Sequence, residues 1–219
     1  TTPASEGVPV GLAGVTQVAA GWFHTLALKR DGSVVAWGVN DAGQCSVPNG
    51  LTGVTQLSAG GSHSVALRAD GTIVHWGRND AGQCNVPEAL KDTTQVATGV
   101  YHTVALKHDG SMVMWGRNDY GQCTAPIGLA AVTQVAAGHH HNMALKTDGT
   151  VVTWGLNAYG QCNVPWGLTA VKQVVAGANH SVAMKATGAV VAWGVNDSGQ
   201  CSVPSGLANA TQVASGASH

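Results

Sequence analysis

The chain has 219 residues, of which only 10% are charged, and its ten Lys and Arg are balanced by eleven Asp and Glu. This composition provides no basic field for nucleic-acid phosphates, so nucleic acid is excluded as an expected partner. No apolar run approaches the roughly 18 residues that a membrane-spanning helix needs, so we expect no membrane insertion.

The chain opens on a short polar segment that a long repetitive region follows. Residues 1–8 are mostly small and include a proline, Pro3, which predicts a linker or a processed terminus. Residues 9–219 repeat with a period of 39 and without insertion or deletion, which predicts one β-propeller domain. The repeated positions include Gln17, Gln56, Gln95, Gln134, Gln173 and Gln212; His24, His63, His102, His141, His180 and His219; Trp37, Trp76, Trp115, Trp154 and Trp193; and Cys45, Cys84, Cys123, Cys162 and Cys201.

The first repeat unit shows the expected elements in order. Short apolar or alternating runs at Val15–Ala20, His24–Lys29, Val34–Trp37 and Cys45–Val47 predict four strands separated by turn residues. Between the second and third runs, Asp31-Gly32 is a tight hairpin signal because Gly tolerates positive φ. The sequence therefore predicts an all-β fold, a β-propeller built from 39-residue four-stranded repeats.

The copy number leaves the closure of the ring open. The first strand occurs six times and the other elements five times, which gives five complete units plus one extra strand. This count fits a fragment or part of a larger ring, a compact five-bladed ring, an incomplete six-bladed ring, or a piece that another chain completes. We favour a fragment or an open array, whose terminal strand offers an edge for self-association.

The repeated large and reactive residues favour a structural role over chemistry. The tryptophans are expected to be wedges between neighbouring blades, since each buries on the order of 200 Å². The cysteines come one per unit, without the paired spacing of metal or redox motifs, and are expected to be small buried hydrophobes. The histidines fall one per blade, too far apart to share an ion, and are expected to be half-buried and structural.

No catalytic, metal or cofactor site is expected. Only His139, His140 and His141 are adjacent enough to converge on one ion, and the spacing of a known calcium loop is absent. The chain also lacks a nucleophile elbow, a phosphate-binding loop and a unique Cys or Ser with a plausible base. Because catalysis needs singular residues and this chain mostly repeats itself, we predict that it is not an enzyme.

The departures from the repeat gather on one face. In an up-and-down blade, the loop after the first strand and the loop after the third strand emerge on the same side. Trp22, Phe23 and Tyr101 fall in the first kind of loop, Tyr120 and Tyr159 in the second. Aromatics and histidines on a ring of short loops are typical of a binding surface. Trp166, which follows Pro165, is expected on the opposite face.

Units such as His24-Thr25-Leu26-Ala27-Leu28-Lys29, followed by Val35-Ala36-Trp37-Gly38 and Gly43-Gln44, resemble repeats of the regulator of chromosome condensation family. The resemblance covers nearly everything after Gly7 and implies a β-propeller, commonly of seven four-stranded blades. The short unit ending in Val-Pro is similar to the bacterial type, which includes propeller-type β-lactamase inhibitors. The resemblance implies contact residues at Trp22, Phe23, Val100, Tyr101, His139 and His140, and favours a secreted or cell-surface location.

The leading hypothesis is a protein-binding propeller, inhibitor-like or adhesion-like, that uses this loop face to hold a protein of unknown identity. The alternative is a structural repeat that self-assembles through its terminal strands. A guanine nucleotide exchange role, which the eukaryotic founding member of the family has, is less favoured because the units are uninterrupted and no basic tail is present.

Overall fold

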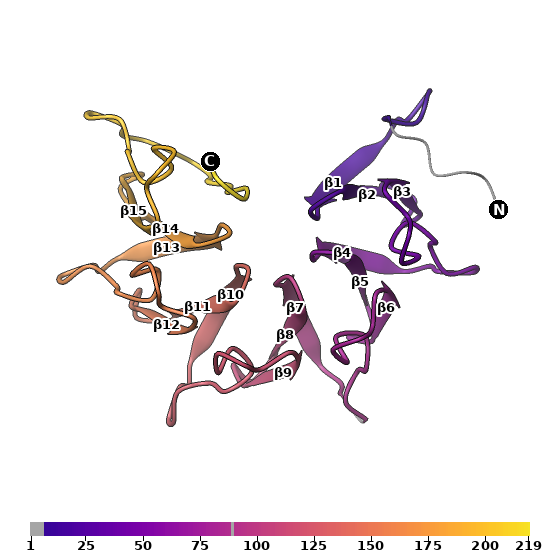
Figure 1. The fold of residues 1–219 in the computed structure, drawn as a ribbon, viewed down its shortest axis with the longest axis horizontal. Coiled ribbons are helices and arrows are strands. Elements are labelled where there is room, and N and C mark those ends of the chain that lie inside the picture. Colours follow the sequence, from indigo (N-terminus) through magenta and orange to yellow (C-terminus); the bar gives the residue numbers. More distant parts are fainter. Residues whose placement is uncertain (1–6, 89) are drawn as a thin grey trace.

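Five three-stranded sheets stand around a central axis in the computed structural model, which describes residues 7–88 and 90–219 (Figure 1). The strands are β1 (Val15–Ala20), β2 (His24–Lys29), β3 (Val34–Gly38), β4 (Val54–Ala59), β5 (His63–Arg68), β6 (Ile73–Gly77), β7 (Thr93–Thr98), β8 (His102–Lys107), β9 (Met112–Gly116), β10 (Val132–Ala137), β11 (His141–Lys146), β12 (Val151–Gly155), β13 (Val171–Ala176), β14 (His180–Lys185) and β15 (Val190–Gly194). The expected all-β propeller is confirmed. Within the described ranges, no helix has the length and apolarity to cross a membrane. The predicted terminal linker lies mostly outside the described residues.

Each sheet is an antiparallel meander whose first strand lies nearest the axis (Figure 1). Short polar turns join the second and third strands. In the first unit Gly32 has a φ of 79°, and the Asp31 carboxylate accepts bonds from the Ser33 amide at 3.0 Å and the Ser33 hydroxyl at 2.6 Å. An Asp-Gly pair thus fixes the hairpin in the way the sequence predicts.

The expected fourth strand is absent, which corrects the four-stranded unit to a three-stranded one. Residues Cys45–Val47 form turns because the Asn40 side chain engages them: its Oδ1 accepts the Cys45 amide at 2.7 Å and its Nδ2 donates to the Ser46 hydroxyl at 3.1 Å. Asn79, Asn118, Asn157 and Asn196 repeat the arrangement. A side chain that bonds the local backbone in this way competes with a strand ladder.

The repeated tryptophans fill the space between neighbouring units, which confirms their expected role. Trp76, Trp115, Trp154 and Trp193 are buried, and each indole N–H donates to a backbone carbonyl of the preceding unit. For Trp115 that acceptor is the carbonyl of Gln83, at 3.0 Å. Trp37, in the first of the described units, lies against no neighbouring unit within the described residues and is only half-buried. The indole therefore joins two blades by packing and by a directed hydrogen bond.

A ladder of glutamines runs from unit to unit near the axis. Gln95 donates its Nε2 proton to the Val135 carbonyl at 3.1 Å and accepts the Val135 amide at 2.8 Å, so it caps both backbone groups of one residue in the next unit. Gln17, Gln56, Gln134 and Gln173 do the same. Gln212, in the segment that follows the fifth unit, is exposed and makes no hydrogen bond within the described residues.

Removing one rung of this ladder should destabilise the protein. We expect Gln95→Ala to lower the free energy of unfolding by about 1–3 kcal/mol, because it leaves the Val135 amide and carbonyl without partners. Urea unfolding measures the change. Gln212→Ala is the matched control and should have almost no effect. Equal losses in the two variants would show that the ladder does not hold the units together.

A second ladder, formed by the repeated histidines, runs beside the glutamine ladder. Its side chains are fully buried, whereas the sequence predicted half-buried ones. His102 lies with its Nε2 2.8 Å from Asn142 Oδ1 in the next unit, and His141 with its Nε2 3.1 Å from Ser181 Oγ. The Nδ1 atoms of His24, His63, His102, His141 and His180 are buried without a hydrogen-bond partner among the described residues. Burial lowers the pKa of His102 to about 4, so the ladder is neutral at pH 7.

The cysteines are half-buried thiols, less enclosed than predicted. All five are free, and the thiol of Cys84 donates to the Arg78 carbonyl at 3.2 Å, a contact that the other cysteines repeat. Burial raises the pKa of the Cys84 thiol to about 11. A protonated thiol is a weak nucleophile, so these cysteines are part of the scaffold.

The five units form an open arc and not a closed ring. Figure 1 shows a gap between β1 and the C-terminal segment. Val18 in the first unit is 58% exposed, whereas its equivalent Val135 is 2% exposed because a preceding unit covers it. The sixth copy of the first segment is not a strand, although the Val213 amide still bonds to Gln173 at 3.0 Å.

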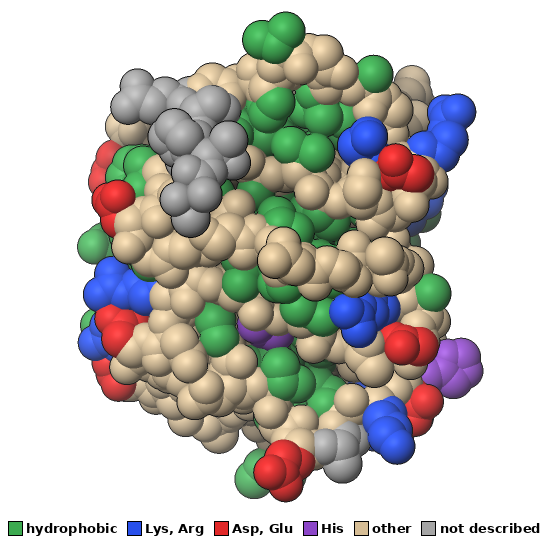
Figure 2. Space-filling view, turned by 90° about the vertical axis from the view of Figure 1, so that its right-hand side faces the viewer, with side chains coloured by type: hydrophobic (Ala, Val, Ile, Leu, Met, Phe, Trp, Pro, Cys, Tyr) green, Lys and Arg blue, Asp and Glu red, His purple; other side chains and the backbone are tan. Residues whose placement is uncertain are grey.

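Charged side chains are dispersed over the periphery. Figure 2 views the molecule edge-on and shows Lys and Arg interspersed with Asp and Glu along both edges, with no patch of one sign. Several of these charges are paired within one turn, as Lys29 with Asp31 at 3.3 Å and Lys146 with Asp148 at 3.2 Å. This surface agrees with the balanced composition of the chain.

Candidate protein-interaction face

Two sets of loops share one face of the arc, as predicted. We call it the loop face. It comprises the inner loops after the first strand of each sheet, residues 21–23, 60–62, 99–101, 138–140 and 177–179, and the outer loops after the third strand, residues 39–44, 78–83, 117–122, 156–161 and 195–200. The sets are joined in each unit by one backbone bond, such as that from the Val39 amide to the Phe23 carbonyl at 2.7 Å. The β-meander thus holds the two loop sets side by side.

The inner loops are connected from unit to unit by their backbones. The Val100 amide donates to the His139 carbonyl at 3.2 Å, and the His139 amide donates to the Ala178 carbonyl at 3.0 Å. Longer bonds continue the chain at both ends, from Gly61 to Val100 at 3.3 Å and from Ala178 to Ala217 at 3.4 Å. Such connections hold the face in one arrangement before any partner binds, which reduces the entropy cost of association.

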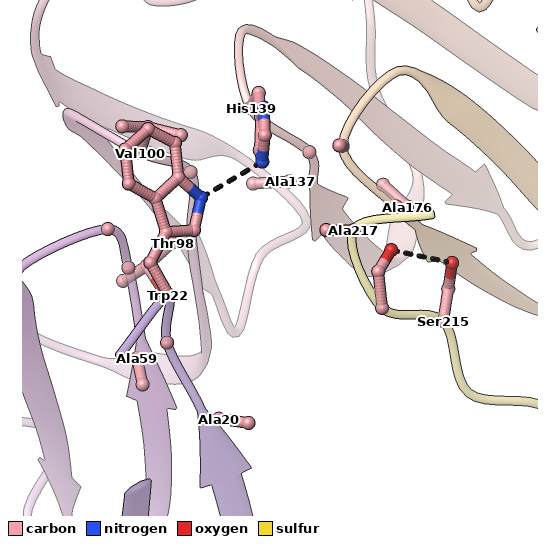
Figure 3. A pocket seen from close by; sticks show the side chains of 18 of the residues that line it. Ala20, Trp22, Ala59, Thr98, Val100, Ala137, His139, Ala176, Ser215 and Ala217 are labelled. Atoms are coloured by element: carbon pink, nitrogen blue, oxygen red, sulfur yellow. Dashed lines mark hydrogen bonds between the residues drawn. The ribbon is translucent and has the colours of Figure 1, made fainter. Parts of the chain in front are cut away.

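Trp22 is held differently, by a side-chain contact across the axis. Its indole N–H donates to His139 Nε2 at 3.0 Å, and the two ring centroids are 5.2 Å apart (Figure 3). Edge-on contacts join the same indole to Phe23 and Tyr101, with centroids 6.4 and 6.5 Å away. The first unit is thereby tied to the third and the fourth units.

Tyr101 is the centre of a second group of contacts. Its ring stacks on His140 at a centroid distance of 6.4 Å, and the guanidinium groups of Arg78 and Arg117 lie 5.6 and 5.7 Å from its centre. Arg78 bonds Asp80 through Nε at 2.7 Å, and Arg117 bonds Asp119 in the same way. These contacts position two cations against one aromatic ring.

Six of the eight predicted contact residues meet in one aromatic and histidine cluster. They are Trp22, Phe23, Tyr101, Tyr120, His139 and His140. Tyr120 joins the cluster through His140, with ring centroids 5.3 Å apart. Trp22, Phe23 and Tyr120 are 44%, 66% and 48% exposed. Tyr159 is exposed on the same face and makes no ring contact within the described residues. Val100 is 2% exposed, so its side chain supports the loops from below.

Sequence reasoning missed Arg78 and Arg117 as members of this face. A signal was present, because the equivalent positions in the other units carry apolar residues, Val39, Leu156 and Val195. Charge at an otherwise apolar repeat position marks a departure in the same way as an added aromatic.

The three adjacent histidines do not converge on an ion. His141 belongs to the buried ladder, while His139 and His140 lie on the loop face with ring centroids 6.4 Å apart. No group of three His, Cys, Asp or Glu side chains suited to a metal occurs in residues 7–88 and 90–219. Burial lowers the pKa of His139 to about 4, so at pH 7 its neutral ring accepts the Trp22 proton.

A central pocket of about 550 Å³ opens among the inner loops (Figure 3). Its wall is formed by the last residues of the innermost strands and the glycines that follow them, for example Ala20-Gly21 and Ala137-Gly138. Its mouth is formed by the next residue of each unit: Trp22, Gly61, Val100, His139, Ala178 and Ala217. The pocket is therefore continuous with the aromatic cluster.

An arc of repeated antiparallel sheets around an axis, with variable loops on one face, defines the class of repeat-built β-propellers. Residues 15–44, 54–83, 94–122, 132–161 and 171–200 match the Regulator of chromosome condensation (RCC1) repeat. These segments make up more than half of the chain, so the chain belongs to this family. No curated protein sequence matches it.

Solved structures share the fold. Yeast RCC1 (Prp20), in a crystal structure with Kap60, aligns with a TM-score of 0.73 at 25% identity over 87% of this chain and 58% of its own. Human WBSCR16 aligns with a TM-score of 0.68 at 22% identity over 82% of this chain and 61% of its own. The CRINKLY WD40 ectodomain of the Arabidopsis thaliana receptor kinase ACR4 gives 0.66 at 22% identity, over 89% and 71%. This chain therefore spans less than two thirds of the first two.

Proposed function

We propose that the protein is a non-catalytic protein-binding propeller whose loop face holds a protein partner. The observation that carries this proposal is a surface cluster of exposed and half-buried residues, every one of which departs from the repeat: Trp22, Phe23, Tyr101, Tyr120, His139 and His140. Aromatic residues and arginine are the types that dominate the binding energy of protein interfaces.

The cluster is also stiffer than an accidental group of surface aromatics. The Trp22–His139 hydrogen bond and the two arginines beside Tyr101 fix the rings relative to one another, and backbone bonds fix the loops that carry them. Rigid aromatic side chains lose little entropy on binding, which is how antibody loops use tyrosine and tryptophan. A tag-captured complex from the native source would identify the partner by mass spectrometry.

The test is a triple replacement, Trp22→Ala, Phe23→Ala and Tyr101→Ala. We expect it to abolish capture of the partner, because truncation of central aromatic residues costs at least about 2 kcal/mol each. Trp166→Ala is the matched control: Trp166 is fully exposed on a turn at the opposite edge and should be dispensable. Unchanged capture by the triple variant would contradict the proposal.

Finer roles follow from the family. A protein-binding role accords with yeast RCC1, whose crystal structures and binding studies involve Kap60, Gsp1p and histones. We propose an inhibitor-like or adhesion-like module of the bacterial type, secreted or at the cell surface, over an exchange factor, because the repeat units carry no insertion.

A second function, self-assembly, is favoured by the open edge of the arc. Val18 is exposed there, and the indole N–H of Trp37 has no hydrogen-bond partner in the part of the chain that the structure describes. An edge of this kind is a template for association with another blade. Light scattering at high protein concentration decides the matter, since a strict monomer contradicts self-assembly and leaves the binding proposal intact.

A further inference from the structure

The mouth of the central pocket is blocked on one side and open on the other. Trp22 and His139 present large side chains on one side, and a hydrogen bond connects their rings. Ala178 and Ala217 line the other side with methyl groups only, and Figure 3 labels Ala217 there. Entry is therefore possible beside the alanines, with the aromatic cluster as the opposite wall.

The interior of the pocket suits an uncharged apolar group. No Asp, Glu, Lys or Arg lines it, and its walls are mainly alanine methyl groups and glycine backbone. Its few hydroxyls already have partners: Thr98 lies 2.8 Å from Ser58 Oγ, and Ser215 lies 2.8 Å from His180 Nε2. Among the polar side chains of the lining, only the His219 ring has no hydrogen-bond partner within the described residues, so most of the wall offers an entering polar group no side-chain partner and favours an apolar one.

The surroundings of the pocket indicate that the apolar group belongs to a protein. Phe23 and Tyr120 are about half or more exposed outside the pocket, and Tyr159 adds exposed aromatic surface on the same face. A small ligand in the pocket would leave this surface in water. A protein loop that inserts its tip would cover the rings as well, and such central anchors are typical of tight interfaces.

The charges around the rim indicate the flanks of that loop. On the outer loops, the cations Arg78 and Arg117 are already paired with Asp80 and Asp119. The remaining carboxylates, those of Asp41 and Asp197, are exposed and have no ion pair or hydrogen bond within the described residues. They stand in the first and fifth units, on the two sides of the gap, so the rim is left with uncompensated negative charge.

Resting on the proposed function, we infer that the partner presents a protruding loop with an apolar residue at its tip and Lys or Arg on its flanks. The tip enters the central pocket beside Ala178 and Ala217, the aromatic cluster packs against the loop, and Asp41 and Asp197 attract the flanking cations.

A phage-displayed library of disulfide-constrained loops tests this inference on the 219-residue protein itself. We expect enriched loops to carry a central apolar residue between basic residues. Ala217→Phe, which narrows the open side of the mouth, should weaken their binding by about tenfold or more. The matched control Ala158→Phe adds the same bulk to an exposed outer loop of this face and should have little effect.

Charge is tested separately. Asp41→Asn combined with Asp197→Asn should weaken the same loops several-fold at low salt and less at high salt, because exposed charges are screened. Enriched loops that are acidic, that lack an apolar tip or that tolerate Ala217→Phe overturn the inference. If such loops still need Trp22, Phe23 and Tyr101, the proposed function stands; if none does, both are contradicted. Failure to enrich any loop also overturns the inference.

Discussion

Trp115→Ala is expected to lower the free energy of unfolding by about 3–5 kcal/mol, which is the usual cost of truncating a buried tryptophan. The indole is buried between two units, contacts His75 at a centroid distance of 5.3 Å, and donates to the Gln83 carbonyl at 3.0 Å. Its removal leaves both a cavity and a carbonyl without its donor. Urea denaturation followed by circular dichroism measures the loss.

Trp37→Ala provides the control within the same repeat. Trp37 occupies the equivalent position, but within the described residues no unit packs over it, and it is half-buried. We expect Trp37→Ala to lower the free energy of unfolding by about half as much as Trp115→Ala, or less. Truncating a side chain that is already partly hydrated removes less buried apolar surface. In a repeat protein, stability depends on the interfaces between neighbours, so the difference isolates the interface. Equal losses would show that the tryptophans stabilise their own sheets and not the junctions.

The scaffold was predictable from the sequence because its constraints recur. The predicted runs Val15–Ala20 and His24–Lys29 coincide with β1 and β2, and β3 extends one residue beyond its prediction. Each boundary is marked by Gly, Asp-Gly or Asn, and five repetitions of one register leave little room for error.

The fourth strand was not predictable in this way. Cys45–Val47 has a strand-like composition, but the Cys45 amide donates its hydrogen bond to the side chain of Asn40, five residues earlier. Pattern reasoning counts apolar residues and does not register such side-chain competition for the backbone. The extent of the turn that Asn40 holds depends on the three-dimensional path of the loop.

The loop face was predictable as a set of residues but not as a geometry. Topology alone places Trp22 and Tyr101 on one side. That Trp22 reaches His139 three units away depends on the curvature of the arc, and that Val100 is buried depends on how closely neighbouring loops approach. The period of the repeat encodes neither the curvature of the arc nor the distance between neighbouring loops. The Trp22–His139 contact and the burial of Val100 are therefore properties of the three-dimensional structure alone.

Acidification from pH 6.5 towards pH 4 is expected to destabilise the protein steeply, because the histidine ladder must stay neutral. Burial lowers the pKa of His63 to about 3, of His102 to about 4 and of His141 to about 3. An unfolded histidine has a pKa near 6.5, so below that value the unfolded chain binds more protons than the folded one. The stabilisation is complete above pH 6.5 and is lost as the pH falls.

Burial also lowers the pKa values of His24, His75 and His139 to about 4. The six histidines together give a slope of up to about 8 kcal/mol per pH unit, since each differential proton contributes about 1.4. Asp31 and Asp148, with pKa values lowered to about 2, begin to contribute below about pH 5, so the histidine slope is measured between pH 6.5 and 5. Urea unfolding at a series of pH values gives the slope.

His102→Gln should reduce this slope by the contribution of about one proton, whereas His108→Gln, in an exposed turn, should leave the ladder and its slope unchanged. A protonated ladder would need an acceptor at each buried Nδ1, and none is present among the described residues. A flat profile between pH 6.5 and 5 would therefore mean that the folded protein admits water or rearranges around these rings.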